Sequence, residues 1–360
     1  MSIQDAAQAE NVAVALVGYG FAGQVFHARV LACVPGLRLA VVVSSQPDKV
    51  AADWPDVPVS PDLGAALAAH PEVQLVVVAT PNAAHFPIAR AALEAGRHVV
   101  VDKPFTLDAG EARQLVALAE RSGKIVSVYQ NRRFDADFLT LRELLAQRRV
   151  GRPVYFESHF DRYRSEVRIR WREQNVPGAG LWVDLGAHLL DQALQLFGVP
   201  DTLQLDSAIL RDSAEVEDYF HAVLRYERGA HSPLRVVLHA TTLAAHPAPR
   251  YLLHGTHGSY VKEGVDPQED ALRAGALPGS EGWGIDPLAG HLVAPDAAAG
   301  TSTVEVPNLA GDYSRYYAMM RDAILGRGAP PVSADEAVQL MELLDLGRRS
   351  AIEGRALPTS

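Results

Sequence analysis

Short apolar runs alternate with amphipathic stretches over the first third of the chain. The apolar runs are continuous, which is typical of strands buried on both faces and hence of a parallel sheet covered by helices on each side. Alternation of strand and helix indicates a doubly wound α/β sheet. The predicted strands are 12–17, 37–44, 74–80, 98–101 and 124–129, and the predicted helices are 21–33, 61–69, 83–95 and 107–121.

The pattern changes after Phe134, where strands gather with few helices between them. Such clustering indicates an open, mainly antiparallel sheet. We therefore predict an α/β plus α+β protein with one domain over residues 1–134 and a second over 135–360. The second is predicted to hold strands 153–161, 202–210, 218–226, 232–242 and 250–262, helices 137–147, 180–197, 313–325 and 334–353, and a long surface loop over 266–300.

Composition excludes several classes of protein. A chain of 360 residues with 48% hydrophobic content can fill two cores, and its net charge of −10 argues against a nucleic-acid or anionic membrane partner. The single cysteine, Cys33, leaves no internal disulfide or multi-cysteine metal site. No apolar run reaches the roughly 18 residues of a spanning helix, and residues 1–11 do not resemble a signal peptide. We expect a cytoplasmic protein.

A glycine-rich turn joins the first predicted strand to the first helix. A GxGxxG motif is weak evidence by itself, but after a buried strand and before a helix it indicates dinucleotide binding. Its first glycine makes the turn, its second lets the pyrophosphate approach, and its third lets helix and strand pack closely. The alternative is a glycine-rich turn that binds nothing. The predicted cofactor-binding residues here are Gly18, Tyr19, Gly20, Phe21, Ala22 and Gly23.

Cofactor preference is read at the end of the second strand, where an acid usually binds the ribose 2′-hydroxyl of NAD. This chain has Ser44 and Ser45 there, no acid before Asp48, and a nearby cation in Lys49. Two hydroxyls and a cation suit a 2′-phosphate, so we expect NADP to be preferred over NAD. The alternative is that these are ordinary turn residues and specificity is loose.

Two further strands end in polar residues at the edge where doubly wound sheets bind ligands. Asn82 and His85 follow the third of the long apolar strands, although Asn82 would also serve as a helix N-cap. Lys103 directly follows the next strand, and a lysine there can orient a hydroxyl and bias its proton, or can simply face solvent. The cofactor-binding residues predicted at this edge are Thr80, Pro81, Asn82, His85, Asp102 and Lys103.

One polar face of the predicted helix 180–197 offers acid–base chemistry. Asp184, His188, Asp191 and Gln195 are spaced to share that face. An Asp can orient an imidazole and the imidazole can take a proton from an alcohol, but such a face is also commonly just solvated.

Two charged segments each stay open to two interpretations. Asn131, with the two arginines after it, could bind substrate or could be only a charged strand end. The cation cluster over residues 159–172, which includes Arg162 and Arg172, could bind an anionic or polyhydroxylated ligand or could pair with neighbouring acids. No His, Asp or Glu residues have the spacing of a metal site along the chain, so we expect no metal.

Taken together, these motifs resemble the Gfo/Idh/MocA family over nearly the whole chain. Five segments carry the resemblance and are similar to bacterial NADP-dependent scyllo-inositol dehydrogenase-like members. They are GYGFAGQVFHA, VDKPFT, NRRFDADF, FDRYR…WRE and DLGAHLLDQALQLFG. The family's Glu-Lys-Pro motif is here Asp102-Lys103-Pro104. The resemblance implies an N-terminal Rossmann domain, a C-terminal sheet that binds substrate and often forms oligomers, and Lys103 and His188 as the catalytic pair supported by Asp184.

The expected activity is hydride transfer between NADP or NAD and a secondary hydroxyl or ketone of a polyol- or sugar-like substrate. Lys103, Asn131, Arg162, Arg172, Asp184 and His188 are the expected substrate-binding residues. A homodimer or homotetramer is expected. The alternatives are an NAD-dependent glycosidase that oxidises its sugar transiently, and a nucleotide-binding regulator without catalysis.

Overall fold

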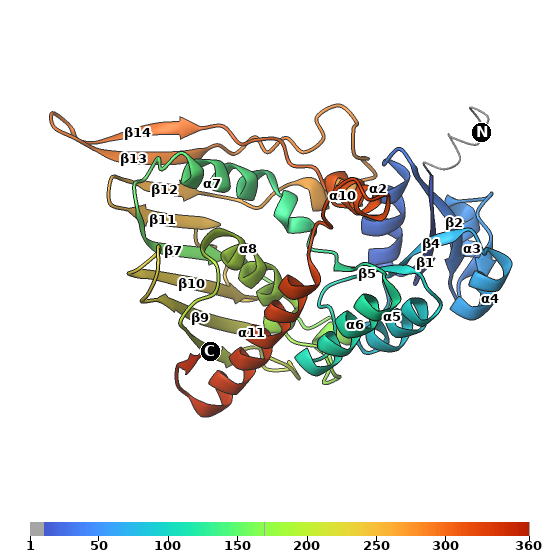
Figure 1. The fold of residues 1–360 in the computed structure, drawn as a ribbon. Helices are drawn as coiled ribbons and strands as arrows, with labels where there is room; N and C mark the ends of the chain where they lie inside the picture. Colours follow the sequence, from blue (N-terminus) through green and yellow to red (C-terminus); the bar gives the residue numbers. More distant parts are fainter. Residues whose placement is uncertain (1–10, 169, 360) are drawn as a thin grey trace. The chain divides into compact units, whose positions relative to one another are not determined.

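The protein forms two compact units, each assembled from separate segments of the chain. We describe residues 11–168 and 170–359 of a computed structural model, shown as a ribbon in Figure 1. The first unit contains the described residues up to Asn131 together with Gln268–Trp283 and Asp312–Met341. The second contains the described parts of 132–267, 284–311 and 342–359. No described helix is both long enough and apolar enough to cross a membrane.

A six-stranded parallel sheet forms the centre of the first unit, as the continuous apolar runs predict. Its strand order is β3-β2-β1-β4-β5-β6, which is the doubly wound order that reverses between β1 and β4. The residues of β1 are all buried, because helices cover both faces. The strands are β1 (Val12–Val17), β2 (Leu37–Val43), β3 (Val59–Ser60), β4 (Val73–Val78), β5 (His98–Val101) and β6 (Val126–Val128).

Helices of the first unit connect these strands. The predicted helix 21–33 contains a π-helical segment, and the predicted helix 83–95 begins as a 3-10 turn. Asp108 caps α6 by accepting a hydrogen bond from the Glu111 amide, and Gly123 ends it in a left-handed conformation. The helical segments are η1 (Gly23–Ala28), α2 (Arg29–Ala32), α3 (Pro47–Asp53), α4 (Leu63–Ala69), η2 (Asn82–Ala84), α5 (His85–Glu94) and α6 (Ala109–Ser122).

Two helices and the first part of a third, all from late in the sequence, complete the first unit. They are α9 (Gln268–Arg273), α10 (Ser314–Ile324) and residues 334–341 of α11 (Ala334–Glu353). Tyr317 of α10 is fully buried and lies 5.3 Å, ring centre to ring centre, from Tyr129 at the end of β6. The core beneath the N-terminal sheet therefore contains side chains from residues after 312.

The second unit is built on a nine-stranded mixed sheet of order β14-β13-β12-β11-β7-β10-β9-β8-β15. All neighbours are antiparallel except β7 and β10, so the mainly antiparallel expectation is confirmed. The strands are β7 (Pro153–His159), β8 (Thr202–Ala208), β9 (Tyr219–Tyr226), β10 (Leu234–Thr241), β11 (Tyr251–Gly255), β12 (Ser259–Lys262), β13 (Gly290–Asp296), β14 (Gly300–Val306) and β15 (Leu357–Pro358).

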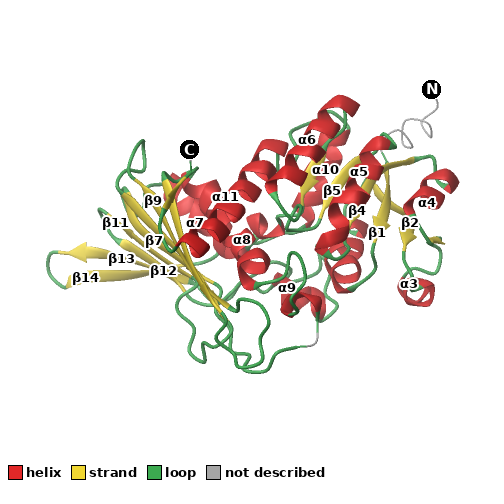
Figure 2. Ribbon diagram, turned by 90° about the horizontal axis from the view of Figure 1, so that it is seen from below, coloured by secondary structure: helices red, strands yellow, loops and turns green. Residues whose placement is uncertain are grey.

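Helices cover one face of this sheet (Figure 2). On the other face, every second residue of a strand such as β9 is half-buried. Along β9, every second residue from Phe220 to Tyr226 is buried against the helices, while Tyr219, His221, Val223 and Arg225 are half-buried. The remaining helical segments are η3 (Asn131–Phe134), α7 (Ala136–Ala146), η4 (Trp171–Glu173), η5 (Trp182–Gly186), α8 (Ala187–Phe197) and α11 (Ala334–Glu353).

Two predicted elements are wrong. The loop expected over 266–300 instead contains α9, all of β13 and the start of β14, because Leu292 is buried when β13 pairs with β12 and the β13–β14 hairpin extends the sheet. The strand expected over 250–262 is a hairpin of β11 and β12. Gly255, the last residue of β11, packs closely on the segment before β7, because a Cβ there would lie 2.1 Å from the Val150 carbonyl oxygen.

Candidate active site

The glycine turn after β1 has two positions that the fold requires and one that it leaves open. Gly18 has φ +96°, and a Cβ there would lie 2.5 Å from the Ala79 carbonyl oxygen. A Cβ on Gly23 would lie 2.1 Å from the Gly18 oxygen, so helix and strand could not pack as they do. A Cβ on exposed Gly20 would meet no described atom within 4 Å. The cradle therefore fits a dinucleotide pyrophosphate, since the open position is where a ligand must approach.

Hydrogen bonds fix the end of β2 beside this turn. Half-buried Ser44 accepts a hydrogen bond on Oγ from the Gln46 amide at 3.0 Å, and Ser45 is exposed. The Lys49 ammonium donates to the carbonyl oxygen of Tyr19 at 3.2 Å and lies 5.6 Å from the centre of its ring. The strand end and the glycine turn are thus joined by a cation.

Asp53, the last residue of α3, is a neighbour of the turn that the sequence did not single out. Its Oδ2 accepts hydrogen bonds from the Tyr19 hydroxyl at 2.8 Å and from Gln24 Nε2 at 2.7 Å. Partial burial acts to raise the pKa of Asp53, but these hydrogen bonds and the charges of Arg29 and Lys49 lower it. A 34-residue separation from Tyr19 gives no sequence signal for this contact.

Two side chains after β4 differ in their hydrogen bonding: the Thr80 hydroxyl and the His85 ring. Thr80 Oγ1 is buried and has no hydrogen-bond partner among the described residues, which leaves it able to bind a ligand. His85 is buried, and its ring nitrogens lie 2.8 Å from the Pro104 oxygen and 3.0 Å from the Thr80 oxygen. Burial lowers the pKa of His85. It therefore holds together the segments that follow β4 and β5.

The expected N-cap role of Asn82 takes a different form. Buried Asn82 begins the 3-10 turn η2 after exposed Pro81, and α5 begins three residues later with Ala84 as its N-cap residue. The N-cap residues of the two segments, Pro81 and Ala84, have no side-chain capping bond. Asn82 thus lies at the sheet edge itself, one turn before the helix.

At the end of β5, Asp102 is held as a carboxylate beside Lys103. Burial acts to raise the pKa of Asp102, but His27, Lys103 and His85 lower it to about 2. Its Oδ1 accepts a hydrogen bond from the Lys103 amide at 2.8 Å. Buried His27 lies with Nε2 3.8 Å from Asp102 Oδ2, and its Nδ1 is 2.5 Å from the Tyr317 hydroxyl. The backbone that presents half-buried Lys103 is therefore fixed by a buried anion.

Two of the four residues of the predicted polar helix face in the second unit are buried, and the other two, Asp184 and Gln195, are half-buried. His188 and Asp191 are 5% and 3% exposed, and Asp191 forms a buried bidentate pair with Arg133 at 2.9 and 2.6 Å. Asp184 and His188 lie in consecutive segments, η5 and α8, because the helix starts with a π-helical turn. A side chain at Gly186 would come within 2.5 Å of the Trp182 ring.

Arg172 is brought beside Asp184, with its Nε 3.5 Å from Asp184 Oδ1. Both line a cavity of about 30 Å³ within the second unit, together with acids and arginines of the following loops. Arg170 pairs with Glu173 at 2.6 Å, so part of the arginine-rich segment forms ion pairs with neighbouring acids, as one of its two interpretations proposed. The guanidinium carbon of Arg162 lies 4.8 Å from the centre of the Phe160 ring, in a cation–π contact.

The predicted substrate-binding residues are divided between the two units. Lys103 and half-buried Asn131 belong to the first unit, while Arg162, Arg172, Asp184 and His188 belong to the second.

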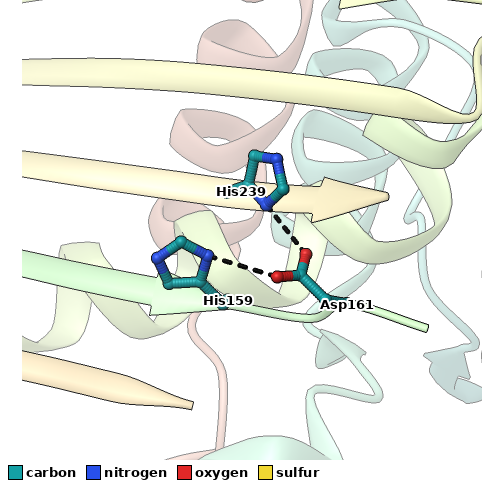
Figure 3. Close-up of side chains that lie close together, drawn as sticks. All are labelled: His159, Asp161 and His239. Atoms are coloured by element: carbon teal, nitrogen blue, oxygen red, sulfur yellow. Dashed lines mark hydrogen bonds and ion pairs between the residues drawn. The ribbon is translucent and has the colours of Figure 1, made fainter. Parts of the chain in front are cut away.

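A cluster that spacing along the chain did not reveal lies on the sheet of the second unit (Figure 3). His159, Asp161 and His239 have potential metal-ligand atoms within 4.8 Å of one another. The expectation of no metal site was based on sequence spacing, but β7 and β10 are parallel neighbours that pair His159 with His239 across 80 residues.

Known proteins resemble the chain over its whole length. A family model described as "Oxidoreductase family, NAD-binding Rossmann fold" matches residues 12–130, and one described as "Oxidoreductase family, C-terminal alpha/beta domain" matches residues 142–359; both are Gfo/Idh/MocA models. The uncharacterized oxidoreductase YdgJ of Escherichia coli is 51% identical, covering 95% of this chain and 97% of its own.

Two further relatives give a named activity and a solved structure. The scyllo-inositol 2-dehydrogenase (NADP(+)) IolW of Bacillus subtilis is 34% identical and covers 97% of this chain and 96% of its own. A Yersinia pestis oxidoreductase of solved structure is 50% identical, with a TM-score of 0.92 and 98% coverage of both chains.

Proposed function

Because the chain belongs to the Gfo/Idh/MocA oxidoreductase family, we propose that it transfers a hydride between a nicotinamide dinucleotide and a secondary hydroxyl or ketone of a cyclitol- or sugar-like substrate. The observation that carries the proposal is the glycine turn, in which Gly18 and Gly23 are sterically required and Gly20 is open. The substrate class is supported by the named activity of IolW, a relative matched over nearly its full length.

The residues that would hold the cofactor follow from this cradle. Gly18–Gly23 would receive the pyrophosphate, and Thr80, with its unsatisfied buried hydroxyl, would bind the cofactor with Pro81, Asn82 and the Asp102-Lys103 segment. His85 would contribute by fixing these segments. When bound, the nicotinamide supplies the hydride acceptor or donor.

NADP is the proposed preferred cofactor. Ser44 and Ser45 stand where an acid would otherwise face the ribose, and Lys49 places a cation beside the glycine turn. The Asp53 carboxylate is already occupied by Tyr19 and Gln24, so it is not oriented as a free acceptor for a ribose diol. These features favour a 2′-phosphate over a free hydroxyl.

The proposed chemistry is carried by the chain's own acid and base groups. His188 would take the proton of the substrate hydroxyl during oxidation and return it during reduction, and Lys103 would orient the same oxygen. Asp184, paired with Arg172, would support His188 and bind substrate hydroxyls together with Asn131 and Arg162. Buried surroundings favour this role, because His188 is 5% exposed and a proton transfer there is shielded from bulk water.

A substrate panel with matched variants tests the proposed function. Inositols, aldoses and glycosides would be supplied with NADP or NAD, and reduced cofactor would be followed at 340 nm. We expect stoichiometric reduced cofactor with a cyclitol or sugar. Lys103→Met and His188→Ala should each lower turnover by about 10²–10⁴-fold, the usual contribution of general acid–base groups. Lys124→Met and exposed His246→Ala are the matched controls and should keep wild-type turnover.

Other outcomes would replace the proposal with a different function. Cleavage of a glycoside without net reduced cofactor would identify a hydrolase that oxidises its sugar transiently. Cofactor binding without turnover on any member of the panel would favour a nucleotide-binding regulator. Wild-type turnover in either the Lys103 or the His188 variant would remove that residue from the proposed mechanism.

A further inference from the structure

On the uncovered face of the second unit's sheet, we propose a binding site for a divalent transition-metal ion, with zinc as the best match, formed by His159, Asp161 and His239. The three side chains converge from the end of β7, the residues after it and the end of β10 (Figure 3). Asp161 Oδ1 lies 2.7 Å from His239 Nδ1, and Asp161 Oδ2 lies 3.5 Å from His159 Nδ1. Two imidazoles and one carboxylate are a donor set that zinc accepts.

Hydrogen-bond chemistry fixes the tautomer of His159. A carboxylate can only accept hydrogen bonds, so the 2.8 Å contact between His159 Nε2 and Glu157 Oε2 requires the proton to be on Nε2. In its neutral form, with the proton on Nε2, His159 carries a bare lone pair on Nδ1. That atom is buried and has no hydrogen-bond partner among the described residues.

The bare Nδ1 of His159 faces another acceptor. Asp161 Oδ2, 3.5 Å away, has no proton to donate as a carboxylate, so two lone pairs point toward one another. Such an arrangement needs a cation between the two atoms, either an added proton or a metal ion. Glu157 and Asp161 place two negative charges beside the two imidazoles, which favours a doubly charged ion.

The outer contacts have the form that supports metal-bound histidines. In metal sites the second ring nitrogen of a ligand histidine usually donates to a carboxylate, which fixes the ring and increases its basicity. Glu157 has this relation to His159 and is itself hydrogen-bonded by the Tyr155 hydroxyl. The chain Tyr155, Glu157, His159 follows alternate residues of one strand, so it lies on a rigid element.

The distances fit zinc after small side-chain movements. Tetrahedral zinc with bonds of about 2.0–2.1 Å separates its ligand atoms by about 3.3 Å. The ligand atoms here lie within 4.8 Å of one another, and His159 and His239 side chains are 12% and 17% exposed. Three protein ligands leave a fourth position for water. The metal ion replaces the proton between His159 Nδ1 and Asp161 Oδ2, which is released to solvent, while the proton on His239 Nδ1 moves to Nε2 when Nδ1 becomes a ligand.

Titration of the full-length, chelator-treated protein with Zn²⁺ alone tests the site. We expect one Zn²⁺ per chain by equilibrium dialysis, release of protons into weak buffer, and a visible tetrahedral absorption band when Co²⁺ replaces Zn²⁺. Mg²⁺ should not compete, because it prefers oxygen ligands and octahedral geometry. His239→Ala and Asp161→Asn should lose the site, and Glu157→Gln should weaken binding about 10–100-fold.

Matched controls separate loss of the site from loss of the fold. His291→Ala, a half-buried histidine of β13 in the same sheet, should bind Zn²⁺ like the wild type. Each variant should keep the wild-type circular dichroism spectrum, and the milder Glu157→Gln substitution tests the site even where another variant unfolds. Absence of stoichiometric Zn²⁺ binding, or binding unchanged in His239→Ala, would overturn the proposal and leave a proton between His159 and Asp161.

Discussion

At the scale of single residues, the glycine turn separates the requirements of folding from those of ligand binding. Gly20→Ala introduces a methyl group that meets no described atom within 4 Å, so thermal stability should stay near that of the wild type. The same methyl group would stand in the path of a pyrophosphate, and NADP affinity should fall at least about tenfold, or about 1.4 kcal/mol. Fluorescence titration and a melting curve measure the two effects.

The comparison for that variant is Gly23→Ala. Its Cβ would lie 2.1 Å from the Gly18 carbonyl oxygen, so stability and binding should fall together. Gly328→Ala, another open position, controls for the substitution itself. Unchanged NADP affinity in Gly20→Ala would show that the turn does not approach the cofactor.

The proposed preference for NADP depends on another residue-scale feature, the pair of serines after β2. Ser44→Asp would set a carboxylate against the 2′-phosphate of NADP and remove a hydroxyl donor. Since hydrogen bonds to charged groups contribute about 1.5–3 kcal/mol, NADP should bind at least about tenfold more weakly, while NAD is unchanged or improved. Dissociation constants for both cofactors measure this. A wild-type preference for NAD would contradict the role given to Ser44.

At the scale of elements, His98 links β5 to the segment that starts β6. Its Nδ1 accepts a hydrogen bond from the Ile125 amide at 3.0 Å. Burial, with the charge of Lys124, lowers the pKa of His98 from 6.5 to about 4. Below pH 6.5 the unfolded chain therefore binds a proton that the folded chain does not, and stability should fall as the pH drops from about 6.5 to about 4.

The variant His98→Asn keeps an acceptor near Nδ1 but cannot titrate. Denaturant melts between pH 7 and pH 4.5 should show a shallower loss of stability in this variant than in the wild type. His70→Asn is the control variant. It removes a histidine whose Nδ1 lies 3.4 Å from Glu72 Oε1 in an exposed contact, and its loss of stability with falling pH is compared with that of His98→Asn. Equal pH dependence in wild type and His98→Asn would show that His98 does not carry the effect.

Strands with continuous or alternating apolar residues could be predicted from the sequence, and those with neither could not. The buried strands β1, β4 and β5 were found because nearly every residue is apolar. β14 was missed because all but its last residue are exposed, so no alternation marks it. The buried contacts of His27 with Asp102 and Tyr317, and the pairing of half-buried His159 with His239, depend on the tertiary fold and sheet topology, which no local pattern of residues contains.

At the scale of the whole molecule, the uncovered face of the second unit's sheet is the expected surface for self-association. Val223 and Val237 pair across β9 and β10 with their side chains on this face, where apolar residues favour contact with a second copy. We expect a homodimer or homotetramer by light scattering at micromolar concentration. Val223→Asp should shift the protein toward monomer, whereas Ile352→Asp, at a residue 85% exposed on α11, should not. A monomeric wild type would contradict this.

The late segments that complete the first unit have a consequence for biosynthesis. During translation, the N-terminal sheet leaves the ribosome long before α10 has been synthesised. At that stage His27 and Tyr129 lack Tyr317, the residue that contacts both of them in the folded protein. The nascent chain must keep this apolar surface protected until residues beyond 312 have emerged, which is a state that chaperones recognise. Completion of the unit that holds the glycine turn is therefore coupled to synthesis of almost the entire polypeptide.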